Sequence, residues 1–175
     1  MKPVVGFVGV GAMGSPMIGH LLAAGYPVQV DARRLEAARD LVSRGAVLAA
    51  SAEQAARGAQ VFCTNVTRTE DVEQVLFGEA GAAAGLAAGA VVIDFSTISA
   101  VATRDMATRL AGQGVRMLDC PVSGGEKGAR DATLSIMVGG DAAVLEEARP
   151  ILQCLGRTIT HIGGHGDGQV AKACN

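Results

Sequence analysis

The chain has 175 residues, 49% of them hydrophobic and 18% charged, which fits one domain of ordinary or slightly larger size and excludes intrinsic disorder. Its 15 basic and 17 acidic residues give a formal net charge of -2, which lacks the positive potential that nucleic-acid backbones and anionic membranes require. One Tyr, four Phe and no Trp also leave too few aromatic faces for stacking bases, so we expect neither nucleic acid nor a membrane as a partner.

Short apolar, β-branched runs alternate along the chain with longer helical patterns, which is typical of βαβ units on a parallel sheet. Strands are predicted at 4–8, 28–30, 60–63, 90–93, 115–118, 133–138 and 158–162. Helices are predicted over 13–24, 35–44, from Ser51, from Asp141 to 152 and from 168 onward. Gly25 and Gly45 stand where left-handed C-terminal caps would lie, and the Gly/Ala stretch at 81–89 is interpreted as a small-residue helix and loop.

The cysteines and the apolar segments bear on the compartment. The four cysteines form no CxxC pair and have no His at ligand spacing, so we expect no disulfide framework and no metal site. Glycines interrupt the apolar start at 4–22, which argues against a signal peptide, and the segment 81–93 is shorter than the roughly 20 apolar residues that span a bilayer. We therefore predict a soluble, cytoplasmic protein with reduced thiols.

The strongest motif, Gly9-Val10-Gly11-Ala12-Met13-Gly14, follows a predicted strand and opens a predicted helix, as a dinucleotide-binding turn does. Gly9 would permit the tight turn, Gly11 would let the backbone approach a pyrophosphate, and Gly14 would let the helix pack close to the strand. The alternative is a glycine-rich turn that only packs tightly.

The end of the second predicted strand is expected to contact the adenosine ribose of such a cofactor. Asp31 there favours a free 2′-hydroxyl, whereas Arg33 and Arg34 are suited to binding a 2′-phosphate. The alternative is that both arginines are solvated residues at the start of a helix.

Two further segments follow strands, where open α/β sheets place ligands. Ser123-Gly124-Gly125 would present backbone N–H groups and a hydroxyl to an anion such as a substrate carboxylate, although a plain loop also needs such glycines. Thr97 would reach the cofactor or the substrate, with helix capping as its alternative. Lys172 and Asn175 share one face of the last helix, and spacing alone leaves Lys172 a solvated residue.

Four segments in this order resemble the β-hydroxyacid dehydrogenase family, the group that includes 3-hydroxyisobutyrate dehydrogenase and 2-hydroxy-3-oxopropionate reductase. They are GFVGVGAMGSPM at 6–17, DCPVSGG at 119–125, TLSIMVGG at 133–140 and GQVAKACN at 168–175. The resemblance implies an α/β fold with a Rossmann-type, doubly wound, mostly parallel sheet and helices on both faces. It divides the chain into an NAD(P)-binding domain at 1–165 and, at 166–175, the start of an interdomain helix leading to a helical carboxy-terminal domain that is absent here.

The resemblance also assigns roles to residues. Lys172 becomes the catalytic residue, and the substrate-binding set is Ser123, Gly124, Gly125, Thr97 and Asn175. The cofactor-binding set is Gly9, Gly11, Ala12, Met13, Gly14, Asp31, Arg33, Arg34, Asn65, Val66 and Thr97. In the family the functional Asn often stands four residues after the Lys, whereas Asn175 stands three after it.

The implied function is an NAD(P)-dependent oxidoreductase that interconverts a small 3-hydroxy acid and its semialdehyde. Arg33 stands where NADP-using members carry an Arg, which favours NADP(H) slightly over NAD(H). The full-length protein is expected to form a homodimer or a homotetramer, and the fragment alone is expected to be inactive. The alternatives are an enzyme like 6-phosphogluconate dehydrogenase, one like the imine reductases, or a nucleotide-binding module without catalysis.

Overall fold

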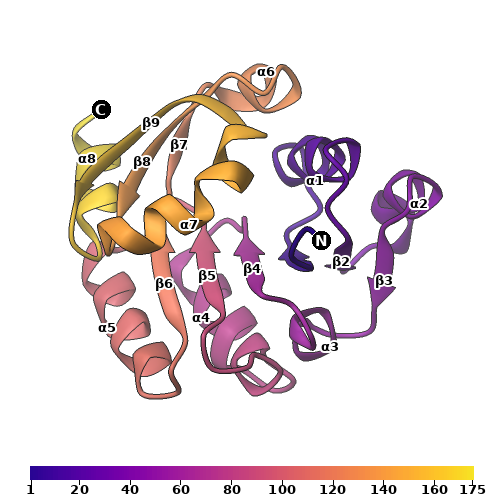
Figure 1. Ribbon diagram of the computed structural model, residues 1–175, viewed down its shortest axis with the longest axis horizontal. Helices are drawn as coiled ribbons and strands as arrows, with labels where there is room; N and C mark the ends of the chain where they lie inside the picture. The colour runs from indigo at the N-terminus through magenta and orange to yellow at the C-terminus, as the bar shows by residue number, and fades with distance from the viewer.

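The computed structural model describes residues 1–175, which fold around one nine-stranded sheet (Figure 1). The strands are β1 (Val5–Val8), β2 (Val28–Asp31), β3 (Val47–Ala49), β4 (Val61–Thr64), β5 (Val91–Asp94), β6 (Arg116–Asp119), β7 (Val122–Ser123), β8 (Leu134–Gly139) and β9 (Gly156–Gly163). Their order is β3-β2-β1-β4-β5-β6-β8-β7, with β9 paired to β8. In Figure 1, β3 lies on the right and β9 on the left.

The pairing makes the sheet mostly parallel. β1 to β6 run parallel to one another, β8 is antiparallel to β6 and β7, and β9 is parallel to β8. This confirms the predicted Rossmann-type, doubly wound sheet. Because β2 and β4 lie on opposite sides of β1, the order of the strands reverses there, and such a switch point opens a crevice at the carboxyl ends of the strands.

Helices cover both faces of this sheet. They are α1 (Gly14–Ala23), α2 (Leu35–Ser43), α3 (Ala52–Ala56), α4 (Thr69–Phe77), α5 (Ala100–Ala111), α6 (Gly125–Arg130), α7 (Ala142–Gln153) and α8 (Asp167–Cys174). One apolar core joins α1, α2 and α7 to strand residues such as Phe7 and Ile93, and a second joins α3, α4 and α5 to Phe62 and Val92. Neighbouring strand residues point to opposite faces, so a strand buried on both faces is apolar throughout.

The predicted strands are confirmed, but the central ones extend one residue further than predicted. β4, β5 and β6 end at Thr64, Asp94 and Asp119, whereas each prediction stops at the preceding apolar residue. Backbone groups form the ladder, so a polar residue pairs as well as an apolar one if its side chain finds partners. These three polar residues are fully buried at the carboxyl edge of the sheet.

The predicted helix ends are confirmed as well. Gly25 and Gly45 follow α1 and α2 with left-handed φ angles of +85° and +106°. At the start of α3, Ser51 Oγ accepts a hydrogen bond from the Gln54 N–H at 3.1 Å, and Asp141 accepts two backbone N–H groups of α7. The turn chemistry in these places is local, which is why the sequence predicts it.

Five elements, β3, β7, α4, α5 and α6, lie outside the predicted set. β7 has only two residues, and α6 has six, two of them glycines that weaken the helical signal. The Gly/Ala stretch at 81–89 contains only a 3-10 turn, η1 (Ala82–Ala84), instead of the helix expected there. No helix in the fold combines the length and the hydropathy that crossing a lipid bilayer requires.

Candidate active site

The turn between β1 and α1 folds tightly over the carboxyl end of β1. Gly9 has a φ of +114°, and a Cβ atom there would overlap the Asn65 carbonyl group. A Cβ atom on Gly14 would overlap the Gly9 carbonyl oxygen, whereas one on Gly11 would meet no heavy atom within 4 Å. The packing of the turn therefore requires the first and third glycines, while the second leaves the backbone open to a ligand.

A pocket of about 610 Å³ opens at this turn and extends over the ends of β2 and β4. Its walls include Gly11 of the turn and, from the end of β2, Asp31, Arg33 and Arg34. Burial raises the pKa of Asp31, and the charge of the nearby Arg33 guanidinium opposes that rise. A carboxylate and two guanidinium groups in this place are suited to a ribose hydroxyl and to a phosphate, respectively.

A second pocket of about 320 Å³ adjoins the first, because Asn65, Val66 and Thr67 line both. Its other walls are Met13, the segment 95–97 after β5, the segment 122–125, and Lys172 of α8. Loops that follow β1, β4, β5 and β6 therefore meet α8 at one edge of the sheet.

Lys172 lines this second pocket, and α8 holds it half-buried there. Its Nζ donates a hydrogen bond to Ser123 Oγ at 3.0 Å, and Asn175 Nδ2 donates to the same oxygen at 2.7 Å. Ser123 lies 49 and 52 positions from these two residues in the sequence. With both acceptor positions of the hydroxyl oxygen occupied, Ser123 is left with its own O–H to donate into the pocket.

The Ser-Gly-Gly turn leads directly into α6. Gly124 and Gly125 have φ angles of +134° and +61°, which favour glycine. His20 of α1 bonds through Nε2 to the carbonyl oxygens of Ala129 and Arg130 at the end of α6, at 3.0 and 2.9 Å. This contact fixes the turn relative to the helix that begins at the first glycine motif, and Figure 1 shows α1 and α6 near each other.

A buried carboxyl group orders the loop after β5. Asp94 Oδ1 accepts hydrogen bonds from Thr64 Oγ1 at 2.8 Å and from the Ser96 N–H at 2.9 Å, while its Oδ2 has no partner. Ser96 Oγ accepts the Val66 N–H at 2.9 Å. Burial raises the pKa of Asp94 to about 6, against the lowering effect of its hydrogen bonds. The network ties the loop that carries Thr97 to the loop shared by the two pockets.

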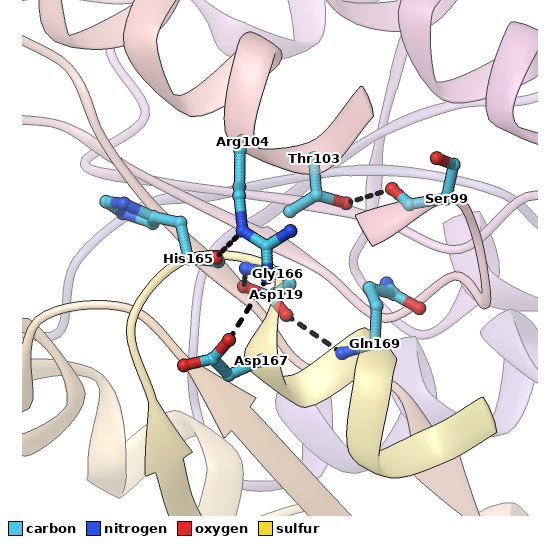
Figure 2. Close-up of polar contacts among 8 residues, drawn as sticks. All are labelled: Ser99, Thr103, Arg104, Asp119, His165, Gly166, Asp167 and Gln169. Carbon is cyan, nitrogen blue, oxygen red and sulfur yellow. Dashed lines mark hydrogen bonds and ion pairs between the residues drawn. The ribbon is translucent and has the colours of Figure 1, made fainter. Parts of the chain in front are cut away.

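Figure 2 shows a second buried carboxylate, Asp119, at the first turn of α8. Its two oxygens accept the N–H groups of Gly166 at 2.8 Å and Gln169 at 3.1 Å. Arg104 of α5 ties down the same turn through the carbonyl oxygen preceding Gly166, at 2.9 Å, and Asp167, at 3.1 Å. An acid that accepts the free N–H groups of a helix N-terminus stabilises it, so these contacts set where α8 lies.

The structure places most of the predicted site residues on the walls of the two pockets. The first pocket holds Gly9, Gly11, Asp31, Arg33 and Arg34; the second holds Met13, Thr97, Ser123, Gly124, Gly125 and Lys172; Asn65 and Val66 line both. Ala12 and Gly14 line neither pocket, and Asn175 reaches the second through its bond to Ser123. Thr97 does not cap α5, because Ser99 does.

Three buried residues outside the predicted site hold its parts together, namely Asp94, Asp119 and Gln169. Asp94 ends the apolar run VVI, and Asp119 follows the apolar pair Met117-Leu118. A carboxylate at the end of a buried strand is a signal that it has partners elsewhere. Gln169 carries no such signal, because its side-chain partners lie 71 and 73 positions away.

The arrangement is suited to a small oxygen-rich molecule. The Lys172 ammonium has three N–H donors and gives one to Ser123, which leaves donors for an oxygen of a bound molecule. An ammonium group in a half-buried pocket also stabilises negative charge that develops on such an oxygen. The structure contains no group of three or more His, Cys, Asp or Glu side chains that could hold a metal ion. All four cysteines are free, and burial raises the pKa of Cys63 and Cys120.

The known proteins that are similar to this chain include two curated enzymes and one solved structure. The chain is 43% identical over 171 residues to 2-hydroxy-3-oxopropionate reductase of Escherichia coli K12, which covers 98% of this chain and 58% of the relative. It is also 43% identical over 171 residues to the NAD-dependent L-serine dehydrogenase of Pseudomonas aeruginosa, covering 98% of this chain and 57% of the relative. The structure of Mycobacterium tuberculosis 3-hydroxyisobutyrate dehydrogenase with L-serine matches with a TM-score of 0.95 and 37% identity, covering 100% of this chain and 59% of that one.

The chain thus spans about 58% of the length of the first of these relatives. Residues 4–163 match the family described as the NAD binding domain of 6-phosphogluconate dehydrogenase. The match covers both pockets except for α8, and it includes the glycine turn, the end of β2 and the Ser-Gly-Gly segment. The chain therefore belongs to this family of NAD-binding domains, as the amino-terminal Rossmann domain of the β-hydroxyacid dehydrogenases.

Proposed function

We propose that the native protein is an NAD(P)-dependent oxidoreductase that interconverts a small 3-hydroxy acid and its semialdehyde, with Lys172 as the catalytic acid and base. The observation that carries the proposal is the meeting of Lys172 and Asn175 on Ser123 Oγ, in a pocket that adjoins the dinucleotide pocket. The names of the relatives support the substrate class, since 2-hydroxy-3-oxopropionate, L-serine and 3-hydroxyisobutyrate each combine a carboxylate with an oxygen on carbon 3.

Cofactor binding, substrate binding and proton transfer are assigned to different residues of the two pockets. The first pocket would hold the adenosine and pyrophosphate of the cofactor, whose nicotinamide supplies or accepts the hydride when bound. Ser123 and the backbone of Gly124 and Gly125 bind the substrate carboxylate. Lys172 donates a hydrogen bond to the aldehyde oxygen, stabilises the negative charge that forms there and delivers the proton. In the oxidation direction, Lys172 accepts the proton of the substrate hydroxyl group.

The cofactor we favour is NADP(H). Arg33 and Arg34 line the first pocket beside Asp31, and a guanidinium group binds phosphate better than it binds a ribose hydroxyl. One relative is NAD-dependent by name, so the preference rests on the two arginines of this chain.

Turnover by the native protein tests the proposal. Wild type and Lys172→Ala are assayed with NADPH and NADH against a panel of small semialdehydes, with Lys127→Ala as the control. Lys127 is exposed on α6 and pairs only with Asp131, so its loss leaves turnover unchanged. Lys172→Ala is expected to lose about 10² to 10⁴ in kcat, the usual contribution of general acid catalysis. Unchanged turnover in Lys172→Ala contradicts its role, and a wild type that binds NADPH without any turnover indicates a nucleotide-binding module.

A further inference from the structure

Gln169 lies on α8 three residues before Lys172 and is almost fully buried, with an exposed fraction of 3%. Both ends of its side-chain amide are used. Nε2 donates to the Ser96 carbonyl oxygen at 2.8 Å, and Oε1 accepts the Ile98 N–H at 3.0 Å. The amide therefore holds the backbone on both sides of Thr97, which lines the second pocket.

The backbone of Gln169 is held as firmly as its side chain. Its N–H donates to Asp119 Oδ2 at 3.1 Å, and the other oxygen of that carboxylate holds the Gly166 N–H (Figure 2). A Cβ atom at Gly168 would come within 3.0 Å of both Asp119 and a carbonyl oxygen of β8, so α8 packs against the sheet with no spare room. Gln169 thus cannot shift along the sheet without breaking contacts on both sides.

The loop held by Gln169 is also hydrogen-bonded to the segment that the two pockets share. Ser96 Oγ accepts the Val66 N–H, and Val66 lines both pockets. A continuous set of hydrogen bonds therefore runs from the segment shared by the pockets, through Ser96, to the helix that carries Lys172. Only a side chain with a donor and an acceptor at its tip completes this set, and an amide does so without charge.

We propose that Gln169 is the positioning residue that sets Lys172 against the Thr97 loop, so that the reacting groups meet across the second pocket. The inference rests on the proposed function for its kinetic consequence. Its structural part is independent of that function: the side-chain amide of Gln169 fixes the position of the Lys172 ammonium group.

Two substitutions separate positioning from mere packing. Gln169→Met keeps the length of the side chain and removes both hydrogen bonds. Gln169→Glu keeps the shape and restores both bonds only when the carboxyl is protonated, because its O–H then donates to the Ser96 carbonyl oxygen. The charged groups around that position are Asp119 of β6, Asp94 of β5 and Lys172 of the same helix, with Arg104 of α5 at the first turn. Burial and the two carboxylates favour the protonated form of the new acid.

The first measurement is kcat of the native protein as a function of pH, with each variant divided by wild type at the same pH. Gln169→Met is expected to lower kcat about tenfold at every pH, since a displacement of a fraction of an ångström in a reacting group has this effect. The Gln169→Glu ratio is expected to rise towards one as the pH falls. The Kd for NADPH is expected to change less than kcat in both variants, because Gln169 lines neither pocket. A Gln169→Glu ratio that stays well below one at every pH, without rising as the pH falls, overturns the inference, even if Gln169→Met fails to fold.

The second measurement does not depend on turnover. The chain has three lysines, Lys2, Lys127 and Lys172, and ¹³C-dimethylation gives each a separate methyl signal in NMR spectra, with Lys172 assigned by its loss in Lys172→Ala. In Gln169→Met the Lys172 signal is expected to move towards that of the exposed Lys127, and in Gln169→Glu it moves back as the pH falls. If wild type shows no turnover, the proposed function fails, but the NMR spectrum still tests whether Gln169 sets the position of the Lys172 side chain. An unmoved Lys172 signal in Gln169→Met overturns the inference.

Discussion

Asp94 is fully buried, with one carboxyl oxygen bonded by Thr64 and Ser96 and the other without a partner. Its pKa of about 6 lies above the value near 3.9 of an unfolded Asp, so the folded state binds the extra proton between these pH values. Stability therefore falls as the pH rises from about 4 to 6, by roughly 3 kcal/mol if Asp94 acts alone. A buried acid at this edge of the sheet thus lowers the stability of the fold at neutral pH.

The variant Asp94→Asn keeps an oxygen for Thr64 and Ser96 and cannot titrate. Its free energy of unfolding, relative to wild type, is expected to improve by about 3 kcal/mol between pH 4 and pH 7. Urea titrations at four pH values measure this difference, with Asp40→Asn, an exposed site on α2, as the control that shows no such trend. Parallel stability curves for Asp94→Asn and wild type would show that Asp94 titrates as an ordinary acid.

Arg33 and Arg34 decide the cofactor in our proposal. Replacing both by Ala is expected to raise the Kd for NADPH at least about tenfold, or 1.4 kcal/mol, and to leave the Kd for NADH nearly unchanged, because only NADPH carries a 2′-phosphate. Fluorescence titration with each cofactor measures this, and Arg39→Ala, exposed on α2, is the matched control. Equal losses for the two cofactors would refute a 2′-phosphate role.

Among the elements, the turn from β1 into α1 contains two glycines with different roles. Gly14 is required for the folded packing, and Gly11 is expected to matter for cofactor binding. Gly14→Ala forces a methyl group onto the Gly9 carbonyl oxygen and is expected to destabilise the fold by about 1 to 3 kcal/mol, as overpacking does. Gly11→Ala places its methyl group in open space, so stability is unchanged while the Kd for NADPH rises at least about tenfold.

Thermal unfolding and cofactor titration of both glycine variants test this contrast. The expected pattern is a lowered Tm for Gly14→Ala and a weakened affinity with a normal Tm for Gly11→Ala. A Gly11→Ala protein that binds NADPH as tightly as wild type would mean that the pyrophosphate does not approach the backbone at this position.

The other elements show which parts of the secondary structure local sequence signals can predict and which they cannot. α1, α2 and α7 are predicted with their caps, because a left-handed glycine or an acid at an N-cap acts within a few residues. α6 and β7 are too short for periodicity, and they form because β8 and α1 provide partners for them. α8 starts one residue before the predicted position, since Asp119 and Arg104 hold its first turn from other elements.

In the molecule as a whole, the candidate site exists only where distant segments meet. The sequence predicts Lys172 and Ser123 as members of a site through their resemblance to a family, whereas their spacing of 49 residues contains no such information. Asp94, Asp119 and Gln169 stay outside the prediction, because a buried polar side chain is defined by partners that the fold brings to it.

The amino-acid sequence by itself determined the alternation of strands and helices, most of the strands and the glycine turn, because hydrophobic periodicity and turn chemistry are properties of neighbouring residues. The Rossmann-type sheet was expected from the resemblance of four segments to a known family. The tertiary structure alone decided that the second pocket adjoins the first, that α8 turns Lys172 towards Ser123, and that Gln169 holds the loop on both sides of Thr97. These contacts cross the sheet between residues far apart in the chain, and they follow from the requirement that every buried donor and acceptor finds a partner.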